Sequence, residues 1–347
     1  MPRVWDVPVH DSTRVRDARV AAEEAATLAG LDEPRTAVAA LVVTELATNL
    51  LKHAGGGQVL VDIVAAPRAD GGAHLVQIAA IDHGPGIADI RAALRDGYST
   101  TRSLGAGLGT CRRIADDFDL YSVPGRGTVV LARVGVRPKE AVPAAAVRVG
   151  GVNVPFAGAQ YSGDAWAWAR SGDRLTLMMA DGLGHGPEAA RASTAASEAL
   201  HRSAHLPPSQ ALVQLDSALR GTRGAAIAVA QVETGAGVLR FAGVGNIGAR
   251  LREGDTWRSL LSRPGIVGVH KHATLREDRT RWAADRMLIL HSDGLPSRWI
   301  PSSDPRLLAA DPAVVAAVAI RDASSSARPM RDDTSVAVLA PTPPEAP

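Results

Sequence analysis

Two polar side chains interrupt an apolar helical stretch over residues 44–54. Glu45 and Asn49 are four residues apart, so a helix places both on one face, next to the apolar side chains of Leu46 and Leu50. A carboxylate and an amide in such surroundings cost free energy unless they contact a metal, water or a ligand. Asn49 offers a hard oxygen to Mg²⁺, and Glu45 can accept a proton from an attacking hydroxyl group or water. The pair therefore predicts a site on this helix face.

Two glycine-rich blocks follow and fit a nucleotide. In Asp82-x-Gly84-x-Gly86, the carboxylate can accept a hydrogen bond from an adenine amino group, and the glycines let the backbone approach the base. The second block, Gly105-x-Gly107-x-Gly109, leads into a helix whose N-terminal N–H groups favour phosphate. Thr128 could supply another base or phosphate contact. Each block alone is a weak signal, but together and in this order they predict a nucleotide site with Mg²⁺.

Aspartates recur at predicted strand ends in the second half of the chain. Asp164 follows a glycine, Asp181-Gly182 follows an apolar strand, Asp293 follows a second strand, and Asp333 precedes a third. Acidic residues at the ends of buried strands need compensating positive charge, and their oxygens suit Mg²⁺ or Mn²⁺. Two ions bridged by one carboxylate can hold a water and direct it in line at a phosphoryl group. The pattern therefore predicts a two-metal hydrolytic site.

The elements that position the first site can be read from caps and periodicity. We expect a strand over 4–9 and a helix from Asp11 or Ser12 to Gly30. Asp32 should cap the helix that carries Glu45 and Asn49. We then expect a helix over 111–117 and further strands over 58–66, 74–82 and on both sides of 124–127.

The sequence becomes rich in proline and alanine around residues 137–146, where we place a linker between two domains. The expected domains are thus 1–136 and 147–340, followed by a disordered tail over 341–347. Short strands dominate the second domain, with strands expected over 173–180, 224–233, 238–244 and 286–291. Helices are expected over 187–203, 208–219 and 312–323.

Composition narrows the function classes. The chain has 347 residues, 46% hydrophobic and 21% charged, which is ordinary for a soluble two-domain protein. A net charge of +2 gives no reason to expect a nucleic-acid partner. One cysteine, the absence of an apolar signal segment and the lack of a long apolar run lead us to expect a cytoplasmic protein with no membrane contact.

The first half of the chain carries the motifs of a known family. Residues 82–87, 95–100 and 104–109 resemble those of the RsbT-like serine/threonine switch kinases of bacterial partner switching, which have the GHKL ATPase fold. The resemblance covers about residues 1–136 and implies a Bergerat α/β sandwich that binds ATP and Mg²⁺. It implies that Glu45 is the general base, Asn49 binds magnesium and Asp82 contacts adenine. The implied targets are STAS-domain anti-anti-sigma factors.

The second half resembles the SpoIIE/RsbX branch of the metal-dependent 2C-type phosphatases, an α-β-β-α sandwich. The motif over 181–186 and the glycine-asparagine turn at Gly245-Asn246 carry this resemblance. It implies that Asp181 bridges two Mn²⁺ or Mg²⁺ ions and that the Gly182 carbonyl binds one of them. Asp293 and Asp333 would hold the other ion, while Asp164 would act through a metal-bound water. Asp332 is assigned a supporting or solvent-facing position.

Together the two halves predict an α+β chain that contains a kinase, which adds phosphate, and a phosphatase, which removes it. We expect it to phosphorylate and dephosphorylate STAS-domain proteins or stressosome-like scaffold proteins. A sigma factor, or a separate phosphatase that binding would activate, is a further expected partner. The alternative is an ATP-dependent module that binds a sigma factor or STAS protein without kinase activity, fused to an active phosphatase. The sequence leaves open whether the chain forms a homodimer.

Overall fold

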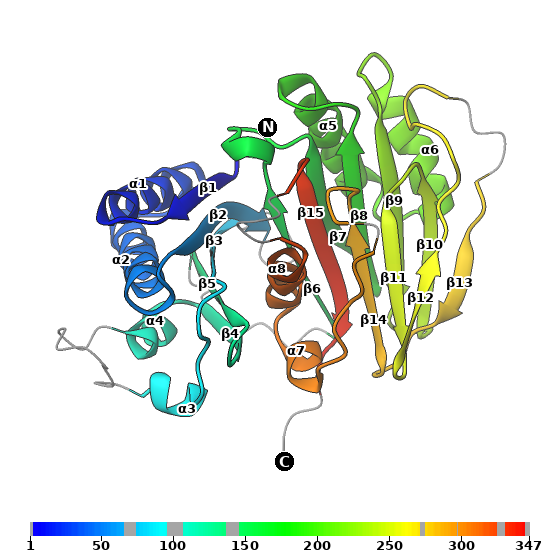
Figure 1. Ribbon diagram of the computed structural model, residues 1–347. Helices are drawn as coiled ribbons and strands as arrows, with labels where there is room; N and C mark the ends of the chain where they lie inside the picture. The colour runs from blue at the N-terminus through cyan, green and yellow to red at the C-terminus, as the bar shows by residue number, and fades with distance from the viewer. Residues whose placement is uncertain are drawn as a thin grey trace. The chain divides into compact units, whose positions relative to one another are not determined.

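The computed structural model describes residues 3–65, 74–95, 107–136, 146–270, 275–296, 298–324 and 330–343. The chain divides into two compact units, an N-terminal unit, Arg3–Pro143, and a C-terminal unit, Ala144–Pro347 (Figure 1). The expected linker falls mostly outside the described residues, so the expected domain limits stay a prediction.

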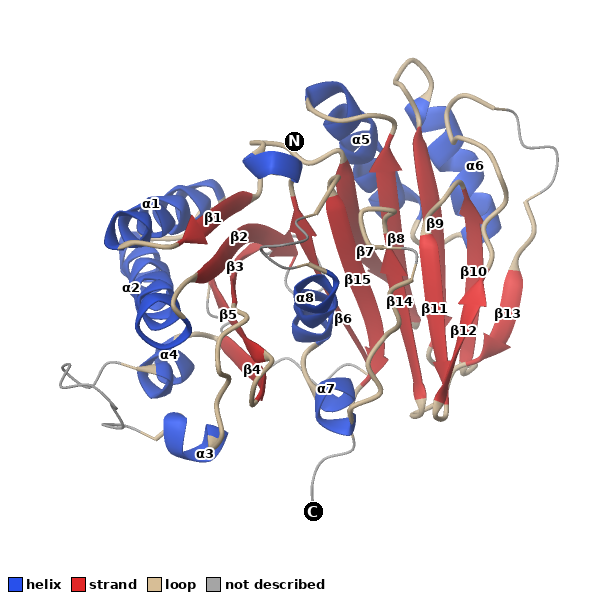
Figure 2. Ribbon diagram, viewed as in Figure 1, coloured by secondary structure: helices blue, strands red, loops and turns tan. Residues whose placement is uncertain are grey.

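The N-terminal unit is built on one antiparallel sheet with the strand order β1-β2-β3-β5-β4. Its strands are β1 Trp5–Val9, β2 Gly57–Ala65, β3 His74–Ile81, β4 Asp117–Val123 and β5 Gly127–Gly135. The helices are α1 Ser12–Leu28, α2 Glu33–Asn49, α3 Ile90–Ala93 and α4 Leu108–Ile114, with a π-helical turn, η1, over Leu50–Ala54. Helices α1, α2 and α4 lie on one face of this sheet (Figure 2). Their apolar side chains form one core with the helix-facing side chains of the strands.

Local signals set the ends of the two long helices. The Asp11 carboxylate accepts hydrogen bonds from the N–H groups of Thr13 and Arg14, and the Asp32 carboxylate accepts one from Arg35. Both caps are as predicted. Gly55 follows η1 with φ +72°, a left-handed conformation that favours glycine. The chain can therefore turn sharply from η1 into β2.

The C-terminal unit contains two five-stranded sheets, with the orders β13-β10-β9-β8-β7 and β12-β11-β14-β15-β6. The strands are β6 Val147–Val154, β7 Asp164–Ser171, β8 Arg174–Gly182, β9 Ala225–Glu233, β10 Val238–Val244, β11 Gly248–Glu253, β12 Thr256–Leu260, β13 Asp278–Arg281, β14 Arg286–His291 and β15 Thr334–Pro341. Helices α5 Pro187–Ser203 and α6 Pro208–Leu219 pack on the first sheet, and α8 Pro312–Ala323 packs on the second. Short helical turns lie at η2 Phe156–Gly158 and α7 Pro305–Ala309. This layering confirms the predicted α-β-β-α sandwich.

Several expected elements differ in detail. The helix expected over 111–117 ends at Ile114, because Asp117 begins β4 and pairs with β5. The strands β6, β7, β11, β12 and β13 were not predicted. Within the described ranges, no helix is long and apolar enough to cross a membrane.

Candidate nucleotide pocket and acidic site

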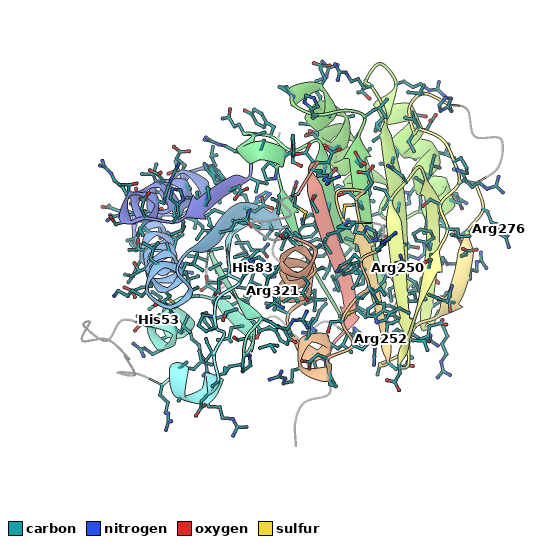
Figure 3. All side chains as sticks on the ribbon, viewed as in Figure 1. His53, His83, Arg250, Arg252, Arg276 and Arg321 are labelled. Carbon is teal, nitrogen blue, oxygen red and sulfur yellow. The ribbon has the colours of Figure 1, made fainter. Side chains whose placement is uncertain are left out.

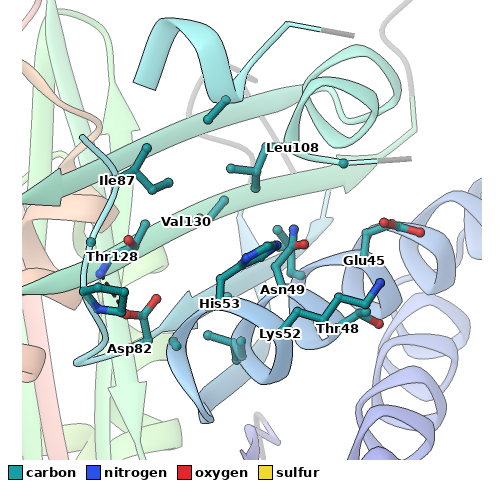
Figure 4. A pocket seen from close by; sticks show the side chains of 18 of the residues that line it. Glu45, Thr48, Asn49, Lys52, His53, Asp82, Ile87, Leu108, Thr128 and Val130 are labelled. Atoms are coloured by element: carbon teal, nitrogen blue, oxygen red, sulfur yellow. Dashed lines mark hydrogen bonds between the residues drawn. The ribbon is translucent and has the colours of Figure 1, made fainter. Parts of the chain in front are cut away.

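A cavity of about 410 Å³ opens in the N-terminal unit beside the C-terminal half of α2. Glu45, Asn49 and His53 point into it from successive turns of α2 and η1 (Figure 4). Thr48 and Lys52 complete the lining on this side. His53 continues the four-residue spacing of Glu45 and Asn49, and that spacing was the sequence signal for its place in the pocket.

Glu45 is half-buried, and burial raises the pKa of its carboxyl group, while the nearby charge of Lys52 opposes this rise. A carboxylate whose pKa is raised is a stronger base than one in water. Cys111 lies buried behind it, and burial together with the charge of Glu45 raises the pKa of that thiol to about 12. Cys111 is therefore a neutral, unreactive side chain of the apolar core, as expected for a buried cysteine.

Asp82 lies across the cavity, directly after β3. Its Oδ1 atom accepts hydrogen bonds from the N–H groups of Gly84 (2.8 Å) and Thr128 (3.1 Å), which fixes the orientation of the carboxylate (Figure 4). Gly127 has φ +86°, and a Cβ there would lie 2.0 Å from the Asp82 carbonyl oxygen. Only glycine permits this close approach, which brings β5 next to Asp82.

The cavity unites most of the residues that were predicted for it. Its lining includes Glu45, Asn49, Asp82, Gly86, Gly107 and Thr128. Gly84 and Gly109 lie close by in sequence but do not line it, and Gly105 lies outside the described residues. Ile87, Leu108 and Val130 give the cavity an apolar wall (Figure 4). An apolar slot with one oriented carboxylate fits a purine base, and the Asn49 amide offers the oxygen that Mg²⁺ prefers.

The acidic residues of the C-terminal unit gather at the ends of strands from both sheets. Asp164 begins β7 and is the direct partner of Asp181 near the end of β8. Asp293 follows β14, and Asp333 immediately precedes β15. The Asn246 side chain donates a hydrogen bond of 2.8 Å to Asp293, so the glycine-asparagine turn after β10 orients this carboxylate.

Burial and mutual repulsion dominate the electrostatics of this acidic cluster. Burial, and then the charges of Asp293 and Asp332, raise the pKa of Asp181 to about 7. Asp164 is 2% exposed, and burial followed by the charge of Asp181 raises its pKa well above the usual range. Its Oδ2 atom is buried and accepts no hydrogen bond from any described residue. Such carboxylates need a cation or a proton to offset their charge.

Asp332 and Asp333 have different surroundings. Asp333 is buried, and its two carboxylate oxygens accept hydrogen bonds of 2.7 Å from the N–H groups of Phe156 and Gly163. Asp332 is exposed, and its charge raises the pKa values of both Asp181 and Asp293. The charge of Asp333 also raises the pKa values of Asp181 and Asp164, so both aspartates act on the cluster. The ligand role of Asp333 stays a prediction.

These donor types suit divalent metals, because the cluster offers carboxylate oxygens at strand ends and the Gly182 carbonyl beside Asp181. In the described part of the chain, however, no three acidic, histidine or cysteine side chains lie close enough together to hold an ion as they stand. The residues fit hard cations by chemistry, and small side-chain movements would have to bring them together.

Two family models match the chain, one in each half. Residues 9–134 match the histidine kinase-like ATPase domain, and residues 171–341 match the stage II sporulation protein E (SpoIIE) family. The nucleotide pocket lies within the first match, whereas Asp181, Asp293 and Asp333 lie within the second.

Individual relatives also match parts of the chain. The chain is 46% identical over 90 residues to the serine/threonine-protein kinase RsbT of Bacillus subtilis, which is 26% of this chain and 65% of that protein. It therefore spans about 65% of the curated relative that it matches. A solved structure from work on the bacterial stressosome as a modular system that controls secondary messenger signalling matches with a TM-score of 0.50 and 28% identity, over 56% of this chain and 98% of that one. RsbX in complex with magnesium is a weaker match, with a TM-score of 0.47 and 19% identity over 56% of this chain and 96% of that one.

Proposed function

The chain joins an RsbT-like ATPase domain to a SpoIIE-type phosphatase domain of the 2C type, and from this premise we propose a bifunctional regulator of bacterial partner switching. Its N-terminal unit would transfer phosphate from ATP to a serine or threonine. Its C-terminal unit would remove phosphate from the same or a related protein. The proposed targets are STAS-domain proteins, including stressosome-like scaffolds.

The observation that carries the kinase proposal is the convergence of three distant segments on one cavity. Glu45 and Asn49 come from α2, Asp82 follows β3, and Thr128 lies on β5. In the proposed reaction, Asp82 binds the base, Asn49 holds Mg²⁺ beside the phosphates, and Glu45 accepts the proton of the attacking hydroxyl. Bound ATP with Mg²⁺ would supply the phosphoryl group.

The phosphatase proposal rests on the acidic cluster. Asp181, with the Gly182 carbonyl, and Asp293 are the proposed Mn²⁺ or Mg²⁺ ligands, joined by Asp332 or Asp333. Asp164 would bind through water, and Asn246 would keep Asp293 aimed at the cluster. When bound, two such ions lower the pKa of a water and polarise a phosphoryl group. Joining both activities in one chain raises their effective concentration around a shared partner.

Intact-mass spectrometry tests both activities together. A purified STAS protein from the same organism is incubated with ATP, Mg²⁺ and the full chain, and then with the Glu45→Ala and Asp181→Asn variants. Phosphate should accumulate with Asp181→Asn and be absent with Glu45→Ala. The Glu45→Ala variant should still remove phosphate from a target that was phosphorylated beforehand.

Other outcomes have equally direct meanings. If ATP binds but no STAS protein gains phosphate with any variant, the N-terminal unit is a nucleotide-dependent binding module instead. If Asp181→Asn leaves dephosphorylation unchanged, the proposed hydrolytic site is wrong.

A further inference from the structure

Arg223 lies against the turn that follows Asp181. In the β8–β9 ladder, Asp181 pairs with Ala226 and Gly182 with Ala225, and the N–H of Leu183 then donates to the Gly224 carbonyl at 3.0 Å. A Cβ placed on Gly184 would lie 3.3 Å from a terminal guanidinium nitrogen of Arg223. This guanidinium is therefore next to the turn that carries the proposed metal ligands.

Arg263 is tied in the same way to the turn on the other side of the acidic cluster. Its carbonyl accepts a hydrogen bond from the N–H of Gly245 at 2.8 Å, and its N–H donates to the Gly243 carbonyl at 2.9 Å. Gly245 is followed by Asn246, which holds Asp293. Arg263 thus stands beside the turn that orients Asp293.

One segment connects these two turns. Four residues after Arg263, Val267 exchanges two backbone hydrogen bonds with Ala225, of 2.9 and 3.1 Å. Ala225 is two residues from Arg223 and pairs with Gly182. Backbone hydrogen bonds therefore fix the Cα positions of both arginines relative to the acidic cluster, while their side chains remain exposed.

No hydrogen bond or ion pair joins either guanidinium group to another residue that the structure describes. Other arginines of this unit are paired. Arg220 pairs with Asp216 at 3.5 Å, and Arg258 pairs with Glu253 at 3.1 Å. Arg252, labelled in Figure 3, contacts Asp255 and the Asp285 carbonyl. An unpaired arginine beside a cluster of carboxylates is available to an anion from outside the protein.

We infer that Arg223 and Arg263 bind the phosphoryl group of the phosphoprotein substrate, an inference that rests on the proposed phosphatase function. A phosphoryl dianion that approaches several carboxylates meets repulsion, which the metal ions offset only in part. Arginine presents paired N–H donors that match phosphate oxygens. Two guanidinium groups, one beside each turn, would hold the dianion over the acidic cluster without taking part in bond formation.

The test measures binding of inorganic phosphate to the full chain in the presence of Mn²⁺ by calorimetry. The variants are Arg223→Gln, Arg263→Gln and the double variant, with Arg220→Gln and Arg258→Gln as controls, because both of these arginines are paired with acidic residues. Each test variant should weaken phosphate binding by about tenfold, and each control by less than about twofold. Arg223→Lys should recover part of the affinity, because it keeps the charge but loses the paired donors.

Hydrolysis of p-nitrophenyl phosphate, followed alongside, separates this inference from the proposed function. Turnover by the wild type with unchanged phosphate binding in both arginine variants overturns the inference and leaves the phosphatase intact. An arginine-dependent phosphate site without turnover supports the inference and removes the hydrolytic function. A rise in KM for the phosphoprotein alone, with phosphate binding unchanged, would mean that the arginines contact the protein surface of the substrate and would also overturn it.

Discussion

Asp164 and Asp181 are direct cross-strand partners in the β7–β8 ladder. Two carboxylates are therefore held side by side within the acidic cluster. Opposed like charges on neighbouring strands destabilise a sheet. Burial increases the free-energy cost of a negative charge on Asp164, whose Oδ2 atom has no hydrogen-bond donor among the described residues. The fold therefore carries an electrostatic cost that a bound cation would relieve.

Replacing Asp181 by asparagine should have opposite effects on the metal-free and the metal-loaded protein. Without metal, Asp181→Asn removes a charge that Asp164, Asp293 and Asp332 repel, so the melting temperature of this unit should rise by about 2–4 °C. With Mn²⁺, the wild type should gain stability and the variant should gain little. Thermal melts with EDTA and with Mn²⁺ measure both effects. A variant that gains as much as the wild type from Mn²⁺ would show that Asp181 is not a ligand.

Replacing Glu45 by glutamine should abolish phosphoryl transfer without abolishing ATP binding. Glutamine keeps the shape of the side chain but cannot accept the proton, so we expect the rate to fall by roughly 10²–10⁴-fold. Single-turnover phosphorylation and nucleotide binding by calorimetry give the two readouts. Glu33→Gln, in the exposed first turn of the same helix, is the matched control. A similar loss of rate in both variants would point to a disturbed helix instead of a lost base.

Asn246→Ala should weaken metal binding through its effect on Asp293, although Asn246 is not itself a proposed metal ligand. The variant removes the 2.8 Å hydrogen bond that orients this carboxylate. Partners of ligands commonly contribute about 10–100-fold to metal affinity or activity, and we expect a loss in that range. Mn²⁺ titration followed by phosphatase activity measures it. Asn246→Asp should be worse than Asn246→Ala, because it adds a negative charge that cannot donate to Asp293.

Asp62 on β2 should make the protein less stable as the pH rises. Burial raises the pKa of this carboxyl to about 7, although the Ile63 N–H donates to it. The folded state then binds a proton more tightly than the unfolded state, so stability falls between about pH 4 and pH 7. Asp62→Asn should therefore stabilise the protein at pH 8, by about 1–2 kcal/mol, and have little effect at pH 4.

Urea unfolding at the two pH values checks this expectation. Asp119→Asn is the control, because Asp119 makes the same contact to the N–H of the next residue in a strand. Its effect should not differ between pH 4 and pH 8 in the way expected for Asp62→Asn. Equal stabilisation by Asp62→Asn at both pH values would show that its charge is not the cause.

Much of the fold was readable from local signals. The bounds of α5, α6 and α8 agree with those expected, because each has a proline in its first turn and an amphipathic or wholly apolar pattern. Strands β12 and β13 were missed since both are short and largely polar, and they exist through pairing with β11 and β10. Their own residues therefore do not predict a strand, and only the neighbouring strand accounts for their conformation.

In the candidate sites, too, some residues could be identified from local sequence signals and others could not. Glu45 and Asn49 could be selected because polar groups at those positions conflict with their apolar surroundings, and Asp82 because it begins a glycine-rich block. The sequence pattern selected Asp333 and not Asp332 as the ligand, but it could not show what each residue contacts, because a shift of one residue in strand register exchanges the two faces. The hydrogen bonds that Asp333 accepts from Phe156 and Gly163 are visible only in the folded chain. The unpaired state of Arg223 likewise depends on which residues fold around it.

The π-helical turn η1 constrains how the N-terminal unit can evolve. Successive i, i+4 positions on an α-helix drift around its axis by about 40° each. The wider turn over Leu50–Ala54 reverses part of that drift, so His53 enters the same cavity as Glu45 and Asn49. A π turn corresponds to one residue inserted into an α-helix. Deleting a single residue there would restore a regular α-helix. His53 would then point away from the cavity, and the start of β2 would shift. Substitutions in η1 should therefore be tolerated far more readily than changes in its length.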